Sequence, residues 1–352
     1  TPGHSSAASD VYKRQEFMTN INFAINGLGR IGKLLFRVLF DEGLSIKLVN
    51  EINGDLEINA ELLMHDSIHG KWNKVVHANN DNLKINDHTI KFTNYKNLND
   101  EKLSNIDVLI DCTGKNKNFE YLQKFLKNGV KKVIVSAPID DPKILNLVYG
   151  VNHHLYNKNE HNIITGASCT TNCIAPIVKV IHDNLKINHG SITTIHNITN
   201  SQTIIDKPSS DLRRSRASMT NLIPTTTGSA KAINLIYPEL KGKLNGHAIR
   251  VPVVNASLTD CVFEVEKNTS KEEVNKLFKE ASKNELINIL GYEEKLLVSS
   301  DYLNDPRSST VDAKSTMVVN KTHVKVYAWY DNEWGYVNRL ADIAKMVGKS
   351  IC

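Results

Sequence analysis

Residues 167–173, Ala-Ser-Cys-Thr-Thr-Asn-Cys, carry two thiols one helical turn apart among three hydroxyls. A disulfide, a metal site, a packed pair of small side chains and a catalytic thiol are the alternatives. A disulfide is disfavoured because Cα atoms four residues apart in a helix lie near the upper limit for a bridge and the Cβ vectors diverge. A zinc site lacks a second ligand pair at finger-like spacing, so we predict no metal.

Cys169 is the candidate nucleophile. Ser168 is suited to cap a helix whose apolar residues recur at 174, 177, 178 and 181, which puts Cys169 in the first turn. Unpaired N–H groups at a helix N-terminus favour a thiolate, so the position predicts a lowered thiol pKa. Cys173, one turn along, is predicted to be a buried small side chain.

A catalytic thiol needs a base, and the chain has 13 histidines. His196 stands out because it lies in a predicted strand flanked by hydroxyls and amides, 27 residues after the thiol. Geometry then decides whether a histidine can take the proton.

A second chemical pattern is the Gly-x-Gly-x-x-Gly formed by Gly27, Gly29 and Gly32. It follows a short apolar strand and opens a helical pattern at 33–40, whose N-terminus is suited to hold a pyrophosphate. Glu51 ends a second predicted strand, where a carboxylate accepts hydrogen bonds from ribose hydroxyls. An acid there repels a 2′-phosphate, which predicts NAD rather than NADP.

The elements around this turn form strand, helix, strand, the size of a right-handed βαβ unit. Further buried strands are predicted at 106–114 and 131–138, with a helix at 118–130 whose Gly129 is placed like a C-terminal cap. We therefore predict a parallel, doubly wound sheet of the Rossmann type for roughly the first 150 residues after Met18.

The pattern of apolar and polar residues changes near residue 190. The segments 190–199, 247–266 and 323–331 alternate as antiparallel strands do, and helices are predicted at 271–282 and 338–351. The predicted fold class is thus α/β, with an N-terminal Rossmann domain and an α+β catalytic domain built on a mostly antiparallel sheet.

These patterns divide the chain into four predicted segments. They are an extraneous or disordered leader (1–17), an NAD-binding Rossmann domain (18–168), a catalytic domain (169–331) and a C-terminal helix that returns to the NAD-binding domain (332–352). One codon choice for residues 10–15 resembles a transposon end used to prepare sequencing libraries. We therefore expect Met18 to be the natural start.

Composition narrows the classes of function. Hydrophobic residues are 41% and charged residues 23% of the 352, and no apolar run reaches the roughly 18 residues of a membrane span. Lys and Arg number 43 against 38 Asp and Glu, and the one dense basic cluster is Arg213, Arg214 and Arg216, so nucleic-acid binding is not predicted as the primary function. Five cysteines, an odd number, favour reduced thiols in the cytoplasm.

Six motifs together resemble those of the phosphorylating glyceraldehyde-3-phosphate dehydrogenase family. They are INGLGRIG (25–32), ASCTTNC (167–173), TTIH (193–196), IPTTTGSAKA (223–232), PELKGKLNGHAIRVPVVNAS (238–257) and WYDNEWGY (329–336), and the likeness extends from Met18 to the C-terminus. The resemblance implies a homotetramer that uses NAD.

The resemblance also implies roles for particular residues. Cys169 would add to the aldehyde to give a hemithioacetal, and His196 would accept the thiol proton and, with the backbone N–H of Cys169, steady the oxyanion. Hydride transfer to NAD would leave a thioester that inorganic phosphate cleaves. The implied cofactor residues are Gly27, Gly29, Arg30, Ile31, Gly32, Glu51, Thr113, Ser136 and Asn332, with Asn332 on the carboxamide.

Two anion sites follow from the same resemblance. Thr199, Arg214 and Arg250 would hold the 3-phosphate of the substrate, and Ser168, Thr170, Thr227 and Gly228 would hold the attacking phosphate. Hydroxyls, backbone N–H groups and a guanidinium fork suit tetrahedral oxyanions.

Some residues depart from the family pattern. Glu51 replaces a usual Asp and reaches one methylene further, and Ser201 stands where Asp or Ala is common. Lys207 stands where Leu is common, in a loop that the resemblance brings near the adenosine end of a neighbouring subunit's cofactor. We interpret Lys207 first as a solvated lysine; the alternative is that it softens the preference against NADP. The segments 190–208, 255–263 and 291–309 look most like the bacterial dehydrogenases encoded beside an arsenic-efflux permease. There arsenate is proposed to replace phosphate, giving 1-arseno-3-phosphoglycerate for export.

Two rival functions were weighed. An erythrose-4-phosphate dehydrogenase shares the thiol, the base and the glycine turn but releases its product with water, and the intact IPTTTG motif argues against it. A catalytically silent binding protein is the alternative from another class. Retention of Cys169, His196 and Asn332 together argues against that.

Overall fold

The structure is a computed structural model that describes residues 21–115 and 118–351. The predicted leader 1–17, the predicted start Met18 and Cys352 lie outside the described residues. The chain forms two compact units, each assembled from separate stretches. Of the described residues, unit 1 comprises 21–115, 118–147, 155–166 and 337–351, and unit 2 comprises 148–154 and 167–336.

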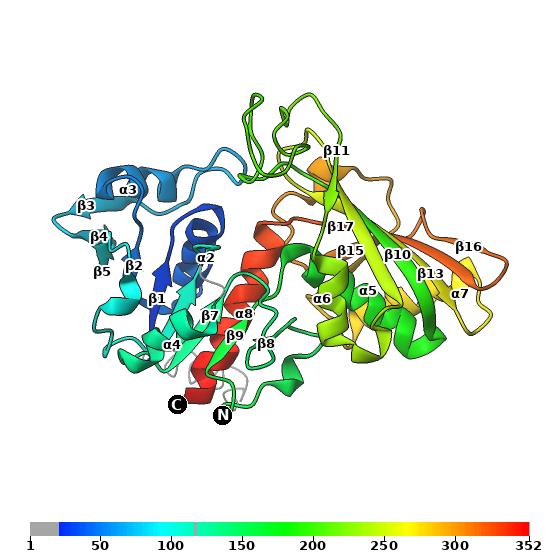
Figure 1. Cartoon of the computed structure of the whole chain (residues 1–352), viewed down its shortest axis with the longest axis horizontal. Helices are drawn as coiled ribbons and strands as arrows, with labels where there is room; N and C mark the ends of the chain where they lie inside the picture. Colours follow the sequence, from blue (N-terminus) through cyan, green and yellow to red (C-terminus); the bar gives the residue numbers. More distant parts are fainter. Residues whose placement is uncertain (1–20, 116–117, 352) are drawn as a thin grey trace, which may run out of the picture. The chain divides into compact units, whose positions relative to one another are not determined.

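Unit 1 is built on a nine-stranded sheet in the order β3-β4-β5-β2-β1-β6-β7-β9-β8 (Figure 1). Its strands are β1 (Asn22–Asn26), β2 (Ser45–Asn50), β3 (Val76–Asn79), β4 (Asn82–Ile85), β5 (His88–Thr93), β6 (Val108–Asp111), β7 (Lys132–Val135), β8 (Leu145–Asn146) and β9 (Ile163–Thr165). The strands from β5 through β8 in this order pair in parallel. The Rossmann prediction is thus confirmed.

The edge of this sheet differs from a purely parallel design, because β3, β4 and β5 pair in antiparallel fashion. Two-residue turns join them, and Asn80 and Asn86 take positive φ angles of 51° and 50° there. Asparagine tolerates this left-handed conformation better than most residues, which suits it to tight hairpin turns.

Helices cover the sheet of unit 1. They are α2 (Arg30–Asp41), α3 (Leu56–Met64), α4 (Phe119–Lys127) and the greater part of α8 (Trp334–Ile351), with the short 3-10 turn η1 (Leu98–Asp100). A second 3-10 turn, η2 (His153–Leu155), spans a boundary between the stretches of the two units. Under α4, Leu122 and Phe125 pack with Leu109 and Val133 of the central strands in one buried cluster. Full burial of such a side chain contributes roughly 1.5–3 kcal/mol. Gly129, at φ 111° just beyond α4, holds the predicted cap position.

Unit 2 is built on an eight-stranded sheet in the order β11-β12-β10-β13-β17-β15-β14, with β16 paired to β17. Its strands are β10 (Ile187–His196), β11 (Ile223–Thr226), β12 (Leu244–Arg250), β13 (Ser257–Val265), β14 (Leu290–Glu293), β15 (Ser309–Asp312), β16 (Met317–Val319) and β17 (His323–Tyr330). The pairs β10–β12 and β14–β15 are parallel and the others antiparallel. The mostly antiparallel prediction is confirmed.

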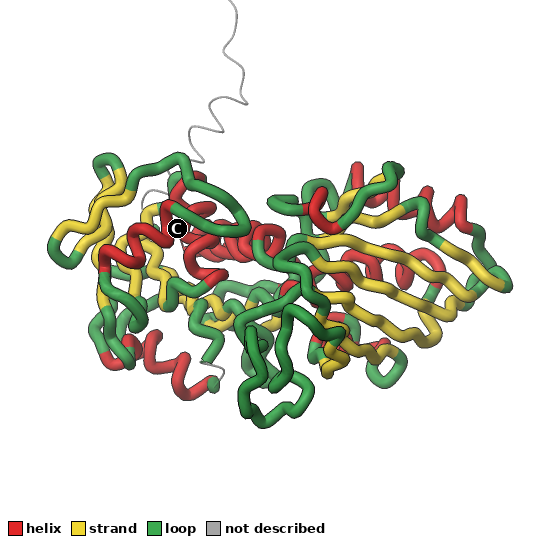
Figure 2. Tube along the Cα trace, turned by 90° about the horizontal axis from the view of Figure 1, so that it is seen from above, coloured by secondary structure: helices red, strands yellow, loops and turns green. Residues whose placement is uncertain are grey.

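Burial alternates strictly along β13 and β17, so one face of this sheet is fully covered. The helices of unit 2 gather on a single side of its strands (Figure 2). They are α5 (Cys169–Leu185), α6 (Ser229–Ile236) and α7 (Lys271–Lys283), with short turns η3 (Pro238–Leu240) and η4 (Ser299–Tyr302). Phe263 and Val326 are among the side chains buried beneath them.

The predicted single strand at 247–266 is two strands, because β12 and β13 pair with opposite edges of β10. The chain must therefore cross from one side of β10 to the other between them. Pro252, which lacks an N–H for a sheet ladder, and Ala256, at φ 62°, lie in that crossing.

Candidate active site

The start of α5 presents the thiol on a constrained turn. Ser168 caps the helix as predicted, and its Oγ accepts a hydrogen bond from the Thr171 N–H at 3.1 Å. Ala167, directly before the cap, has a φ of 53° that non-glycine residues seldom adopt. The hydroxyl of Tyr336 donates to the Ala167 carbonyl at 2.9 Å and helps to hold this turn. Strain of this kind is characteristic of functional sites.

Cys169 and His196 come together although they lie on different elements. His196 ends β10, and its Nε2 lies 3.8 Å from the Cys169 Sγ. The His196 ring is buried and meets the ring of Tyr330 edge to face, with centroids 6.1 Å apart. A thiol is therefore within reach of an imidazole whose orientation is fixed by packing.

The environment keeps both groups neutral. Burial, with the positive charge of Arg250, lowers the pKa of His196 to about 3, so it is an unprotonated base at neutral pH. Burial raises the pKa of the Cys169 thiol, while hydrogen bonding by Thr170 and the charge of Arg250 act in the opposite direction. The predicted lowering of the thiol pKa is thus wrong in net direction for this structure, because burial outweighs the helix terminus. A base is needed to make the thiolate.

Arg250 connects this pair to an anion site. It lies opposite His196 in the parallel β10–β12 register. Its Nη1 lies 2.5 Å from the His196 Nδ1 and donates to the Asn197 carbonyl at 3.1 Å. Its Nε is buried and has no hydrogen-bond partner among the described residues. A guanidinium with an unused, desolvated donor is suited to capture an oxyanion.

The other residues predicted to hold the 3-phosphate form a linked group. Thr199 Oγ1 lies 2.8 Å from the Ser201 Oγ, which accepts from the Arg214 Nη1 at 3.3 Å. Arg214 also donates through Nε to Thr225 at 3.1 Å. Ser201, which departs from the family pattern, is thus the connection between Thr199 and Arg214.

The residues predicted to hold the attacking phosphate are joined through Ser229. Its Oγ lies 3.0 Å from the Ser168 Oγ, and its N–H donates to the Thr227 Oγ1 at 3.2 Å. Gly228 caps the start of α6 beside them. Thr170 is separate from this chain of contacts, because its hydroxyl lies 2.9 Å from the buried hydroxyl of Tyr330.

Asn332, predicted to bind the carboxamide, is buried after β17 in unit 2. Its Oδ1 accepts from the Ser257 Oγ at 3.1 Å. Ser257 also accepts from the Asn197 N–H at 3.2 Å. One serine therefore fixes both Asn332 and the residue that follows His196.

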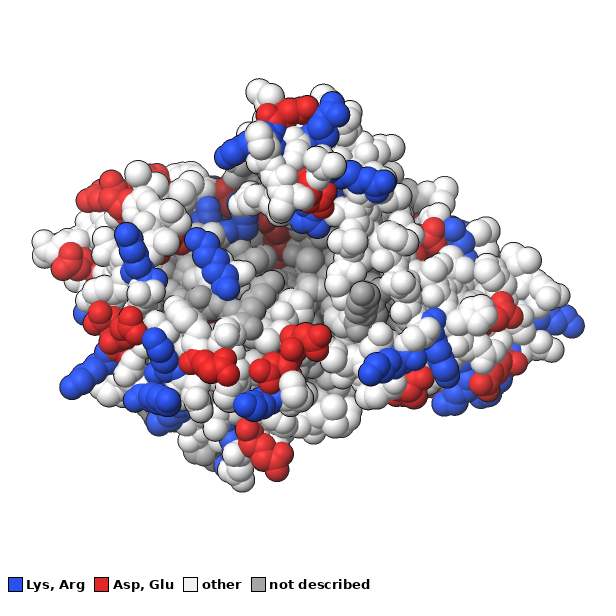
Figure 3. Space-filling model, viewed as in Figure 1, with Lys and Arg blue, Asp and Glu red and all other residues white. Residues whose placement is uncertain are grey.

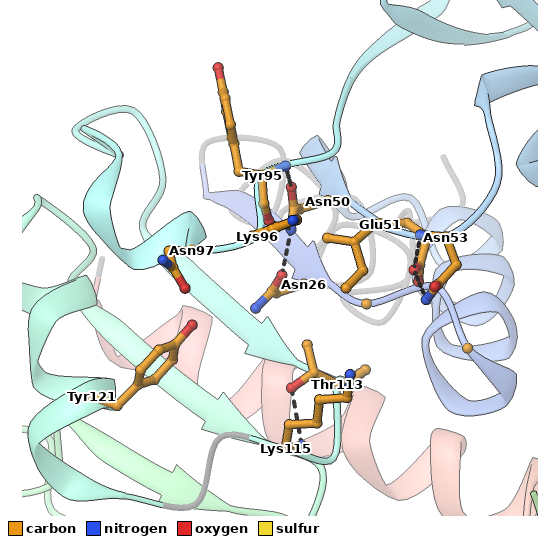
Figure 4. Close-up of a pocket in the computed structure, with 14 residues that line it drawn as sticks. Asn26, Asn50, Glu51, Asn53, Tyr95, Lys96, Asn97, Thr113, Lys115 and Tyr121 are labelled. Atoms are coloured by element: carbon orange, nitrogen blue, oxygen red, sulfur yellow. Dashed lines mark hydrogen bonds between the residues drawn. The ribbon is translucent and has the colours of Figure 1, made fainter.

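A cavity of about 230 Å³ lies in unit 1 at the glycine turn (Figure 4). Four of the predicted cofactor residues line it: Gly27, Gly29, Glu51 and Thr113. The Glu51 Oε2 accepts from the Leu28 N–H at 2.7 Å, and its Oε1 accepts from the N–H and Nδ2 of Asn53 at 2.8 and 2.9 Å. The longer side chain is thus locked to the turn and aimed along the cavity wall.

Buried amides connect the strand ends around this cavity. The Asn26 Nδ2 donates to Asp111 at 2.9 Å, and the Asn50 Nδ2 donates to the Asn26 Oδ1 at 2.9 Å. The Asn50 Oδ1 in turn accepts from the Tyr95 N–H at 2.9 Å (Figure 4). This network holds the carboxyl ends of β1, β2 and β6 in place relative to one another. The carboxyl ends of the strands form the edge where open α/β sheets bind ligands.

Gly32 and Gly29 are suited to the turn for different physical reasons. A Cβ on Gly32 would lie 1.9 Å from the Gly27 carbonyl oxygen, so the helix and turn pack too closely for any side chain. A Cβ on Gly29 would meet nothing within 4 Å, which leaves open space above the first turn of α2. A closely packed turn with an open side fits a dinucleotide pyrophosphate on the helix N-terminus.

The remaining predicted cofactor residues do not line the cavity. Ile31 and Gly32 lie within α2, and Ser136 follows β7, with its N–H donating to the Asp111 carbonyl at 2.9 Å. The Arg30 guanidinium forms a bidentate ion pair with Asp66. The Asp66 carboxylate also accepts hydrogen bonds from the backbone N–H groups of Ile68 and His69. Burial alone would raise the pKa of Asp66, but these hydrogen bonds hold the pKa well below its usual range.

Sequence reasoning missed several residues that position the site. They are Asn53 and Asp66 in unit 1, and Asn197, Ser229, Ser257 and Tyr330 in unit 2. Tyr330, Asn197 and Ser229 lie inside or beside the family motifs. Their place in the motifs is the sequence signal from which a role in the site could have been predicted. Ser257 is the last residue of the 238–257 motif, whereas Asp66 carries no local pattern.

Three further features bear on the class of site. Across residues 21–115 and 118–351, no three His, Cys, Asp or Glu side chains gather in a way that could hold a metal ion. In the same residues no helix is long and apolar enough to cross a bilayer. On the face seen in Figure 3, Lys and Arg are interspersed with Asp and Glu.

Comparison with known proteins gives full-length matches. Residues 21–119 match the NAD-binding domain of glyceraldehyde 3-phosphate dehydrogenase and residues 168–332 match its C-terminal domain. Glyceraldehyde-3-phosphate dehydrogenase 3 of Nostoc sp. is 52% identical over 335 residues, 94% of this chain and 99% of the relative. The dehydrogenase 2 of Streptomyces avermitilis is 45% identical over 94% of this chain and 99% of its own, and the dehydrogenase 1 of Bacillus subtilis is 45% identical over 94% and 98%.

Proposed function

Because the chain belongs to the glyceraldehyde-3-phosphate dehydrogenase family and uses NAD, we propose that it oxidises D-glyceraldehyde 3-phosphate and passes the acyl group to inorganic phosphate, giving 1,3-bisphosphoglycerate. The observation that carries the proposal is the 3.8 Å separation of the Cys169 Sγ from the Nε2 of a neutral, buried His196. A thiol and a base at this distance can make a covalent bond to an aldehyde carbon.

The first step adds the thiol to the aldehyde. The Cys169 sulfur bonds to the carbonyl carbon as His196 takes the thiol proton, and the carbonyl π bond becomes an oxyanion. The resulting imidazolium and the backbone N–H of Cys169 stabilise that oxyanion, which becomes a hemithioacetal once protonated. A base with a pKa near 3 returns its proton readily.

Oxidation then converts the hemithioacetal to a thioester. Bound NAD supplies the acceptor for the hydride that leaves the former aldehyde carbon. The residues fit that group: the open side of the turn at Gly29 would receive the pyrophosphate, and the Glu51 carboxylate would accept hydrogen bonds from the ribose hydroxyls. His196 removes the hydroxyl proton as the hydride departs. Asn332, held by Ser257, binds the carboxamide in this proposal.

Inorganic phosphate completes the reaction by attacking the thioester carbon. The new C–O bond forms as the C–S bond breaks, and the thiolate of Cys169 leaves. The hydroxyls of Ser168 and Thr227, joined through Ser229, and the Gly228 backbone at the start of α6 support this assignment. Thr170 is assigned to the same site by the family resemblance alone, since its hydroxyl contacts Tyr330. Neutral donors bind an oxyanion without burying additional charge.

The 3-phosphate of the substrate is assigned to Arg250, Arg214 and Thr199. The buried, unpartnered Nε of Arg250 and the Thr199–Ser201–Arg214 contacts support it. Two guanidiniums are suited to a phosphate dianion, since each offers a planar fork of donors.

The same proposal covers the acceptor anion, the biological role, the compartment and the oligomeric state. Arsenate has the charge and shape of phosphate, so the same hydroxyls would accept it, giving 1-arseno-3-phosphoglycerate in arsenic detoxification. The likeness of three segments to arsenic-linked dehydrogenases supports that role. We also infer a cytoplasmic homotetramer. Unpaired Cys112, Cys169, Cys173 and Cys261 support a reducing compartment, and the family resemblance supports the tetramer.

The test is the initial rate of NADH formation from glyceraldehyde 3-phosphate and NAD with phosphate, with arsenate and with neither. Cys169→Ser serves as the blank. We expect a rate that requires one of the anions and disappears in the variant. A rate that ignores both anions would mean that water cleaves the thioester, which favours the erythrose-4-phosphate reaction. An inert wild-type protein would favour a silent binding protein.

A further inference from the structure

A second cavity, of about 250 Å³, lies in unit 1 away from the glycine turn. Its buried wall is apolar and consists of Leu48 on β2 and Leu98, Leu103 and Ile106 from the segment that leads into β6. Cavities of about 150 Å³ lined by such side chains can hold a benzene ring. The wall therefore offers room for an aromatic or branched aliphatic group.

The rim of this cavity carries Lys47, Lys91 and Lys102. A break in the β1–β2 register explains the direction of Lys47. Phe23 pairs with Ile46 and Ala24 with Leu48, so Lys47 has no partner on β1. An extra residue of this kind turns its side chain away from the regular alternation, and such bulges often direct side chains into sites.

Lys91 reaches the same cavity by regular pairing. It lies opposite Leu48 in the parallel β2–β5 register, and neighbouring residues in register project from the same face of a sheet. Lys47 and Lys91 thus lie on adjacent strands, one residue out of register, and both are exposed lining residues of the same cavity. An anion bound between the two like charges would be attracted by both.

No acidic side chain neutralises these lysines. Lys47, Lys91 and Lys102 form no ion pair with any residue in 21–115 or 118–351, whereas Glu101 is the one acid on the rim. Three ammonium groups against one carboxylate leave a net positive mouth over an apolar interior. This combination favours binding of a ligand that carries a negative charge on an apolar group.

The cavity adjoins the dinucleotide cavity without being part of it. Tyr95 lines both cavities. Thr93, in the second cavity, donates to the Asn50 Oδ1 at 2.8 Å, and Asn50 lines the first. A ligand in the second cavity would thus touch the residues that hold the wall of the first.

From these observations we propose that the second cavity is a binding site for a small organic carboxylate with an aromatic or branched aliphatic group. The carboxylate lies between Lys47 and Lys91, and the apolar group packs on Leu48, Leu98, Leu103 and Ile106. The site is distinct from the dinucleotide and phosphate sites proposed above.

The probe we would use is 2-naphthoate, measured by equilibrium dialysis against the full chain. Saturating NAD and inorganic phosphate are present throughout so that the other anion sites are occupied. The neutral 2-naphthamide controls for the apolar contribution. The test variant is Lys47→Met with Lys91→Met, which keeps the apolar stems. The matched control is Lys71→Met with Lys84→Met, which removes two exposed lysines that line neither cavity.

We expect saturable binding of about one naphthoate per chain, weakened about tenfold or more in the test variant and unchanged in the control variant. The amide should bind at least several-fold more weakly than the acid. Equal affinity in the two double variants would overturn the proposal. So would binding that is seen only in a parallel dialysis without NAD, because the probe would then occupy the dinucleotide cavity.

Discussion

The Nη1 of Arg250 lies 2.5 Å from the His196 Nδ1, although that same nitrogen lies 2.8 Å from the Asn197 carbonyl oxygen. The two neighbours require opposite tautomers of the imidazole. Arg250 can only donate, so it requires a bare Nδ1 and puts the proton on Nε2. The Asn197 carbonyl can only accept, so it requires Nδ1–H and leaves Nε2 bare to receive the thiol proton.

Removing the Arg250 guanidinium should therefore change the tautomer of His196. We expect ¹⁵N spectra of histidine-labelled wild-type protein to show Nε2–H at His196 without ligand, and Nδ1–H in Arg250→Met. Glycerol 3-phosphate should move the wild-type spectrum toward that of the variant, because the phosphate takes up the guanidinium. The His196→Asn spectrum assigns the signal. An unchanged tautomer in Arg250→Met contradicts the coupling.

Alanine at two positions of the glycine turn should separate binding from folding. Gly32→Ala puts a methyl 1.9 Å from a backbone oxygen, so we expect both a lower unfolding midpoint and loss of NAD binding. Gly29→Ala meets nothing within 4 Å, so the fold should be retained while NAD affinity falls about tenfold or more. Thermal unfolding without ligand and NAD titration measure the two effects. Equal NAD affinity in Gly29→Ala and wild type would remove the pyrophosphate from that position.

Replacing Glu51 by Gln should weaken NAD binding and reduce the preference over NADP. The Gln amide nitrogen would face either Leu28 N–H or Asn53, donors that the carboxylate now accepts from. We expect the KM for NAD to rise roughly tenfold, and the ratio of kcat/KM for NAD to that for NADP to fall. Glu57→Gln, exposed on α3, is the matched control. A change confined to kcat would argue against a ribose role.

Stability should fall as the pH is lowered from 7 to 5, and His196 should account for part of the loss. The pKa of His196 is near 3 in the folded protein and near its ordinary value of 6.5 when unfolded. Between these values the unfolded chain binds the extra proton, so acid favours unfolding by about 2 kcal/mol over this interval. Urea midpoints at the two pH values should show a smaller decrease for His196→Gln than for wild type. His189→Gln, exposed on β10, should behave like wild type.

The local parts of the fold were predictable from sequence, and the non-local parts were not. The cap at Ser168, the first-turn position of Cys169 and the cap position of Gly129 depend on neighbouring residues. The pairing of His196 with Arg250 depends on a parallel register between strands whose facing residues are 54 positions apart, and no local pattern encodes that. The direction of the thiol pKa failed for the same reason, since burial is a property of the whole unit.

The edge hairpins and the crossing at 251–256 show the same limit. Asn80 and Asn86 are turn signals on either side of a short segment that contains only two apolar residues, Leu83 and Ile85, too few for a strand prediction. The split of 247–266 follows from β12 and β13 taking opposite sides of β10, which continuous alternation in the sequence conceals.

Unit 1 is assembled from three stretches of chain, the last of which is 337–352. Val337, Leu340, Ala341, Ile343, Ala344 and Val347 of α8 are buried in the folded protein. During synthesis these residues emerge after the 167–336 stretch of unit 2, so unit 1 cannot close its core until that stretch has been made. The earlier stretches of unit 1 therefore remain incompletely folded while unit 2 is synthesised. In that state unit 1 exposes apolar surface that chaperones can recognise.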